Sequence, residues 1–144
     1  MASVHAYLTF NGNTEEAFNF YKSVFGGEFD YIGKFKDMPP SEDYPTVSAE
    51  EGERIMHVSL RIGKDSVLMA SDSTSMSGDV TFGNNFSISI NAESREEADK
   101  LFNGLSAGGS VIMPMDNTFW GAYFGMFTDK FGINWMVNFD EQPQ

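Results

Sequence analysis

The apolar residues near the start of the chain recur first with the spacing of a strand and then with that of a helix. Residues 4–12 predict a strand that ends at an Asn-Gly turn signal. Residues 13–27 predict an amphipathic helix, with Asn13 or Thr14 as its cap and a Gly-Gly pair as its stop. The expected apolar face of this helix comprises Ala17, Phe20, Tyr21, Val24 and Phe25.

Three more strands are expected to complete this first half. Residues 28–37 alternate between aromatic and polar positions, as a strand does. Residues 54–63 and 65–72 predict a hairpin that turns around Gly63-Lys64. Residues 38–53 lie between them, hold three of the five prolines, and are interpreted as an exposed loop.

The same pattern begins again after a polar, Gly-rich linker at residues 73–83. Residues 86–109 repeat the strand, the cap, the acidic helix start and the double glycine. The stretch Glu15-Glu16-Ala17 matches Glu96-Glu97-Ala98, and Gly27 matches Gly108, so the period is about 80 residues.

Strands are then expected over residues 110–115, 118–127 and 133–139, with "TDKFG" as the turn between the last two. Asp129 is expected to build that turn with its side chain, and Asp72 to act likewise at the end of its own strand.

A β-α-β-β-β unit covers only one face of its sheet with a helix, so a second copy is needed to cover the other. The sequence therefore predicts an α+β protein made of two tandem βαβββ modules. We expect one domain over residues 1–144, with modules at about 1–72 and 84–140.

The amino-acid composition argues against several classes of function. The 9 basic and 21 acidic residues give a net charge of -12, which argues against binding to nucleic acid or to an anionic membrane. The chain has no cysteine, so it has no disulfide, thiolate metal site or cysteine nucleophile. The first ten residues lack the pattern of a signal peptide, and no apolar run is long enough to span a membrane, so a soluble cytoplasmic protein is expected.

Two segments carry a resemblance to a known family. "YLTFNGNTEEAFNFYKSVFGGEF" and "WGAYFGMFTDKFGINWMVNF" resemble the PhnB-like branch of the glyoxalase/bleomycin-resistance/dioxygenase superfamily, also called vicinal oxygen chelate proteins. The resemblance implies curved mixed sheets that enclose a cup, with the helices outside. It also implies a homodimer, in which strands or modules are often exchanged.

Metal enzymes of this superfamily take their ligands from the first and last strand of each module. Carried over to this chain, these positions fall near His5, Ala6 or Tyr7 and at Met69 in the first module. In the second module they fall at Phe86 or Ser87 and at Met136. Most of these side chains are poor ligands for a divalent ion, so we expect the usual metal site to be absent.

Some PhnB-like proteins carry the name demethylubiquinone methyltransferase. A methyltransferase commonly has a glycine-rich turn between a strand and a helix for its nucleotide-like cofactor, and no G-x-G motif of that kind follows a strand here. No cofactor is expected.

The chain has two histidines. His5 stands at the start of the first strand, where an exposed histidine is ordinary. His57 shares a strand face with Ile55 and Ser59, so it points either into the cup or out to solvent. It is the best general base by intrinsic pKa and a candidate polar anchor for a ligand.

The aromatic segment near the C-terminus supplies the other candidates. Trp120, Tyr123 and Trp135 either fill the core or line a π-rich cup. Asn134 lies among them and either holds a turn or faces a polar ligand. The same two interpretations, core filling or an adaptable pocket lining, apply to the methionines on the strands: Met56, Met69, Met113, Met115, Met126 and Met136.

The favoured function is the binding of a small, partly aromatic or hydrophobic molecule in the cup, as bleomycin-resistance relatives bind a drug without chemistry. Trp120, Tyr123, Asn134 and Trp135 would form its wall, and His57 its polar anchor. The alternative is a metal-dependent lyase, isomerase or dioxygenase that uses His5, His57 and a carboxylate. A third alternative is an interaction module that has no small ligand.

Overall fold

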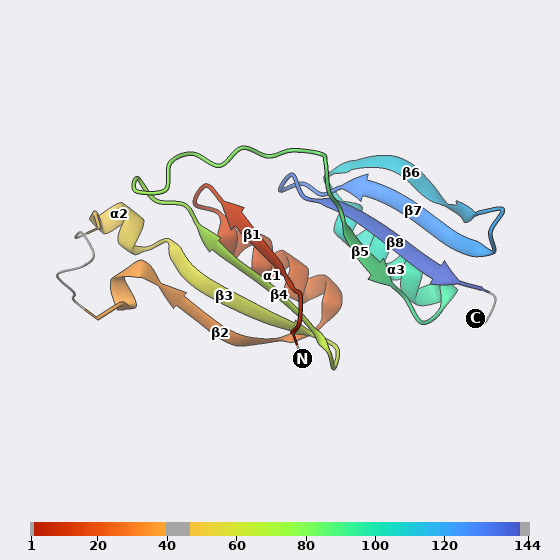
Figure 1. Cartoon of the computed structure of the whole chain (residues 1–144), viewed down its shortest axis with the longest axis horizontal. Helices are drawn as coiled ribbons and strands as arrows, with labels where there is room; N and C mark the ends of the chain where they lie inside the picture. The colour runs from red at the N-terminus through yellow and green to blue at the C-terminus, as the bar shows by residue number, and fades with distance from the viewer. Residues whose placement is uncertain (1, 40–46, 142–144) are drawn as a thin grey trace. The chain divides into compact units, whose positions relative to one another are not determined.

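The computed structural model describes residues 2–39 and 47–141, which form two compact units, residues 1–81 and 82–144. We call them the first module and the second module. The first contains β1 (Ala6–Phe10), α1 (Thr14–Phe25), β2 (Glu28–Lys34), η1 (Phe35–Asp37), α2 (Ala49–Gly52), β3 (Ile55–Ile62) and β4 (Ser66–Asp72). The second contains β5 (Ile88–Asn91), α3 (Arg95–Ser106), β6 (Ser110–Asn117), β7 (Ala122–Thr128) and β8 (Asn134–Asp140) (Figure 1).

Each module is a four-stranded mixed sheet with one long helix on one face (Figure 1). The strand order is β1-β4-β3-β2 in the first sheet and β5-β8-β7-β6 in the second. In both sheets the first strand runs parallel to its neighbour and the other pairs are antiparallel. This topology confirms the predicted α+β fold of two tandem βαβββ modules; that they form one domain stays a prediction.

The two cores lie between each sheet and its helix. In the first module Phe18 and Tyr21 of α1 are fully buried, and Phe18 meets Phe10 of β1 edge to face at 6.5 Å. In the second, Phe102 of α3 meets Phe127 of β7 at 5.1 Å. The expected face of α1 omitted Phe18 and included Phe20, which is only half-buried.

The double glycine after each long helix has the same two tasks in both modules. Gly26 and Gly108 take positive φ angles of 80° and 79°, which glycine adopts without strain. A Cβ on Gly27 would overlap the carbonyl oxygen of Arg61, and one on Gly109 would overlap that of Thr128. The second glycine therefore lets the chain pass close to a neighbouring strand. The sequence pattern matched Gly27 with Gly108. By their roles in the structure, Gly26 corresponds to Gly108 and Gly27 to Gly109.

The two long helices begin in different ways. Ser94 caps α3 by accepting the backbone N–H of Glu97 at 3.0 Å. The side chain of Asn13, expected to cap α1, makes no capping hydrogen bond. The buried carboxylate of Asp72 replaces it.

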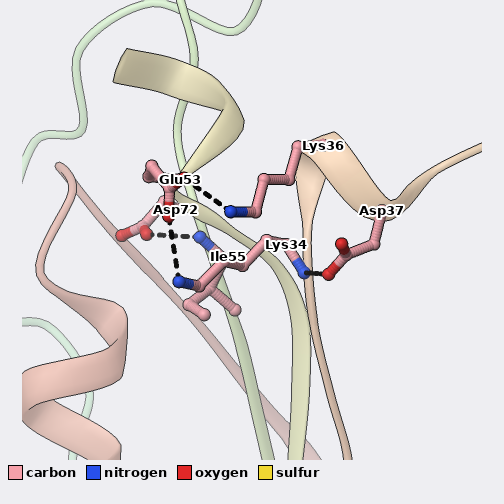
Figure 2. A network of polar contacts seen from close by, with 6 residues as sticks. All are labelled: Lys34, Lys36, Asp37, Glu53, Ile55 and Asp72. Atoms are coloured by element: carbon pink, nitrogen blue, oxygen red, sulfur yellow. Dashed lines mark hydrogen bonds and ion pairs between the residues drawn. The ribbon is translucent and has the colours of Figure 1, made fainter. Parts of the chain in front are cut away.

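Asp72 stands at the end of β4 and accepts hydrogen bonds from the start of α1. Its Oδ1 accepts the N–H of Thr14 at 3.0 Å, the hydroxyl of Thr14 at 2.6 Å and the N–H of Gly12 at 2.9 Å. Its Oδ2 accepts the N–H of Ile55 at 2.8 Å (Figure 2). A negative charge at this end also suits the helix dipole. Asp72 thus joins three elements instead of building a local turn.

Close to Asp72, an exposed ion-pair cluster joins the end of β2 and η1 to Glu53, the residue that follows α2 (Figure 2). Glu53 pairs with Lys36 at 2.6 Å and with Lys34 at 3.0 Å. Hydrogen bonds from Lys36 and Lys34 lower the pKa of Glu53. The hydrogen bond to Glu53 in turn raises the pKa of Lys34. Such solvent-exposed pairs contribute little to stability.

Three segments differ in kind from the sequence prediction. The strand expected over residues 28–37 ends at Lys34 and continues as the single turn η1. The loop expected over 38–53 contains the short helix α2, capped by Ser48; residues 40–46 of that loop lie outside the described residues. Residues 118–121, expected to open a strand, form a turn because β6 extends to Asn117 and Gly121 takes a φ of 91°.

Candidate functional site

An aromatic cluster lies on the face of the first sheet that α1 leaves uncovered. Val58 and Leu60 of β3 point into the core, so the alternating residue His57 points to the opposite face. Tyr7 of β1 and Tyr31 of β2 lie beside His57 on that face. We call these three side chains the aromatic cluster.

The three rings are in contact. The Tyr7 hydroxyl lies 3.1 Å from Nδ1 of His57, and the two rings stack with centroids 5.6 Å apart. The Tyr31 ring lies on the other side at 6.0 Å. Tyr7 is 49% exposed and Tyr31 48%, so about half of each ring remains available to a partner. His57 is half-buried between them.

A glycine makes room for this arrangement. Gly33 of β2 is paired with His57 of β3, and the Tyr31 side chain folds over Gly33. A Cβ there would lie 2.8 Å from Cζ of Tyr31 and closer still to its hydroxyl oxygen. Gly33 therefore holds space for the tyrosine ring beside His57.

The other histidine takes no part in the cluster. His5 precedes β1 and is exposed. Within residues 2–39 and 47–141, no three histidine, aspartate or glutamate side chains gather closely enough to hold a metal ion.

The residues at the superfamily's ligand positions do not fit a divalent metal. Tyr7 is paired with Met69 on β4, and Ser89 with Met136 on β8. Ser89, and not Phe86 or Ser87, is therefore the residue of the first strand that faces Met136. A phenol, a hydroxyl and two thioethers lack the imidazole and carboxylate donors that such ions require.

Trp135, one of the predicted wall residues, lies in the core of the second module. It is 1% exposed on the face of β8 that α3 covers. Its indole N–H donates to Oδ2 of Asp129 at 2.8 Å. Oδ1 of Asp129 accepts the N–H groups of Phe131 and Ile133, which confirms that Asp129 builds the turn between β7 and β8.

Tyr123 also lies on the α3 side of the second sheet. Its hydroxyl donates to Asp99 at 2.6 Å, and the Arg95 guanidinium stacks over its ring at 3.8 Å. The hydrogen bond to Asp99 holds the proton on the phenol and raises the pKa of Tyr123. Tyr123 therefore anchors α3 to β7.

Trp120 and Asn134 lie elsewhere. Trp120 sits in the turn between β6 and β7, 60% exposed and edge to face with Phe119. Asn134 begins β8; it accepts the Thr128 hydroxyl at 2.7 Å and donates to the carbonyl of Gly83 at 3.1 Å. The four residues of the predicted wall are thus distributed over a turn, the core and both faces of the sheet.

The aromatic cluster contains two residues that sequence reasoning did not select. The sequence distinguishes Tyr7 only as a metal-ligand position, and Tyr31 only as part of an alternating strand. The available signal was the alternation of β3, since His57 occupies a position that opposes the core residues Val58 and Leu60. Strand pairing, which brings the three rings together, cannot be derived from alternation alone.

Comparison with known proteins agrees with the fold. Residues 3–137 match the Glyoxalase/Bleomycin resistance protein/Dioxygenase superfamily. The chain is 33% identical over 141 residues to protein YjdN of Escherichia coli (strain K12), covering 94% of each chain. The chain therefore belongs to this superfamily.

Two solved structures show which branch of the superfamily the chain resembles. A crystal structure of protein PA1353 from Pseudomonas aeruginosa is 42% identical, with a TM-score of 0.83 over 99% of this chain and all of that one. A structure from Bacillus cereus, described as a putative 3-demethylubiquinone-9 3-methyltransferase, PhnB protein, is 27% identical, with a TM-score of 0.74 over 96% and 99% of the two chains. Within the superfamily the chain is PhnB-like.

Among the described residues, no helix is long and apolar enough to cross a membrane.

Proposed function

We propose that this protein binds a small, partly aromatic or hydrophobic molecule, and that the aromatic cluster of the first module is the main contact. The half-exposed rings of Tyr7 and Tyr31 on either side of His57 carry the proposal. Soluble proteins usually bury such rings, and exposed aromatic surface beside a polar group is typical of ligand sites.

His57 would provide the polar anchor. One ring nitrogen lies within hydrogen-bonding distance of the Tyr7 hydroxyl, which fixes the orientation of the imidazole. The second nitrogen can then donate to or accept from a ligand, according to the tautomer. The flanking phenol rings offer flat surfaces for stacking.

The predicted wall residues take different parts in this proposal. Asn134, half-buried on the face of β8 opposite to Trp135, would be a ligand contact offered by the second module. Trp135 and Tyr123 would support the second sheet from its α3 side. Trp120, exposed in its turn, would be a further contact within the second module.

By resemblance to its superfamily we also propose a cytoplasmic homodimer with the ligand cup completed on assembly. Analytical ultracentrifugation of the full chain tests the dimer directly, and a monomer at micromolar concentration would contradict it.

The binding proposal is tested by thermal denaturation of the full chain against a panel of aromatic and hydrophobic compounds. A ligand at about 100 times its Kd stabilises a protein by about 2.7 kcal/mol, so the Tm should rise by several degrees. His57→Gln and Tyr31→Leu should reduce the rise, and His5→Gln, which changes the exposed histidine, should not.

Two results would contradict the proposal. One is the absence of any ligand-dependent shift, which would favour an interaction module. The other is near-stoichiometric retention of Ni²⁺, Zn²⁺, Mn²⁺ or Fe²⁺ after desalting, lost in His57→Gln. That result would favour the metal-dependent enzyme.

A further inference from the structure

Three methionines form a row across the second sheet. Met113 of β6 is paired with Met126 of β7, and Met126 is paired with Met136 of β8. Directly paired residues project from the same face, with Cβ atoms about 4.5–5.5 Å apart. We call Met113, Met126 and Met136 the methionine row.

The row lies on the face that α3 leaves uncovered. The residues next to it along the strands, Phe127 and Trp135, point into the core beneath α3. Alternation therefore directs Met126 and Met136 away from the helix. Met113 is 47% exposed and the other two are half-buried, so all three side chains are partly accessible.

The fourth methionine of these strands points the other way. Sδ of Met115 lies 2.7 Å from where a Cβ of Gly125 would stand, next to Cε2 of Phe102 on the α3 side. The pairing of β6 with β7 is irregular between Met113 and Asp116, which is how Met113 and Met115 come to face opposite sides. Met115 is thus a natural internal control.

The three sulfur atoms can converge on one ion. Adjacent strands lie about 4.7–4.9 Å apart, so the outer two methionines stand one strand to either side of Met126. Methionine has three rotatable side-chain bonds, which allow Met113 and Met136 to bring their sulfur atoms over the centre of the row. Three thioethers form a ligand set that soft cations prefer and hard divalent cations do not.

Charge and composition also favour a cation here. Asp116 is paired with Phe124, which places its carboxylate on the same face, one row away from Met113. The chain has a net charge of -12 and no cysteine, so no thiolate competes with the thioethers.

We propose that the methionine row binds a soft monovalent cation of the Cu(I) class. The site shares no residue with the aromatic cluster, because every residue of the row belongs to the second module. It shares Met136 with the superfamily's ligand positions, but its ligands come from three adjacent strands of one sheet and are all thioethers.

The test is titration of the full chain with Ag⁺, a redox-stable analogue of Cu(I), by calorimetry in chloride-free nitrate buffer. We expect one Ag⁺ per chain. Met126→Leu conserves volume and removes the central sulfur, and we expect affinity to fall roughly tenfold or more. Met115→Leu removes a sulfur on the α3 side and should leave affinity unchanged.

A second measurement identifies the ligands. With ¹³C-methyl-labelled methionine, Ag⁺ should shift the methyl resonances of Met113, Met126 and Met136 and leave that of Met115 in place. No saturable binding, or equal losses in Met126→Leu and Met115→Leu, would overturn the proposal. Ag⁺ binding lost in His57→Gln but kept in Met126→Leu would also overturn it. A negative ligand screen leaves it unaffected, so the two proposals fail separately.

Discussion

The indole nitrogen of Trp135 lies 2.8 Å from Oδ2 of Asp129, six residues earlier in the chain. The same carboxylate accepts the backbone N–H groups of Phe131 and Ile133 through its other oxygen. One buried side chain therefore shapes the β7–β8 turn and satisfies the polar atom of the largest buried aromatic residue.

Asp129→Asn should destabilise the protein by about 1–3 kcal/mol, because the amide replaces one acceptor oxygen with a donor in a buried site. The free energy of unfolding in urea measures this loss. Asp65→Asn, which removes the same charge from the exposed β3–β4 turn, is the matched control and should change it little. Equal effects in the two variants would contradict the assigned role of Asp129.

The double glycine after α1 gives a second prediction, with two adjacent substitutions of the same size. Gly26→Ala should cost about 1–2 kcal/mol, since its φ is 80° but no heavy atom lies within 4 Å of the new Cβ. Gly27→Ala should cost more than about 3 kcal/mol, because its Cβ would overlap the carbonyl of Arg61. Thermal denaturation of both variants provides the comparison, and a reversed order would refute it.

Tyr123 gives a prediction about pH. Its pKa is raised, chiefly by the hydrogen bond to Asp99, so the folded protein holds the phenolic proton more tightly than the unfolded chain. The stabilisation is complete below the ordinary tyrosine pKa of 10.0 and declines as the pH rises from there through the folded-state pKa.

Absorbance of tyrosinate at about 295 nm measures this titration. Asp99→Asn should shift one tyrosine to ionise at lower pH, and Tyr123→Phe should remove that one titration from the profile. An unchanged profile in Asp99→Asn would show that the carboxylate does not control the phenol.

A substitution at Gly33 should disturb the aromatic cluster without a large loss of stability. Gly33→Ala should change the unfolding free energy by less than about 1 kcal/mol, because the Cβ meets the movable end of the Tyr31 side chain and not backbone. It should nevertheless displace the Tyr31 ring from His57. The imidazole NMR shifts of His57 should therefore change, whereas those of His5 should not. An altered fold with unaltered His57 shifts would contradict this account.

The repeated fold could be predicted from sequence because both modules use the same local signals. Acidic residues at the helix start, helical apolar spacing and a terminal glycine pair each depend on nearby residues only. The cap of α1 could not be predicted this way, since its acceptor, Asp72, lies 58 residues after Thr14. Only the folded sheet brings them together.

The candidate site was harder to predict for a related reason. Aromatic residues that are dense in sequence, such as Trp120 and Trp135, were expected to share a wall, but alternation and the β6–β7 turn separate them. The aromatic cluster instead draws one residue from each of three strands. Its members are far apart in sequence, and strand pairing determines which of them become neighbours.

The different caps of the two long helices have a consequence during synthesis. α3 can be capped as soon as Ser94 and Glu97 have left the ribosome. α1 emerges earlier but must wait for Asp72, the last residue of its own sheet, before its N-terminus is satisfied. Although the first module is made first, its helix gains this cap only when β4 is complete, so a chain interrupted before residue 72 leaves that helix without its cap.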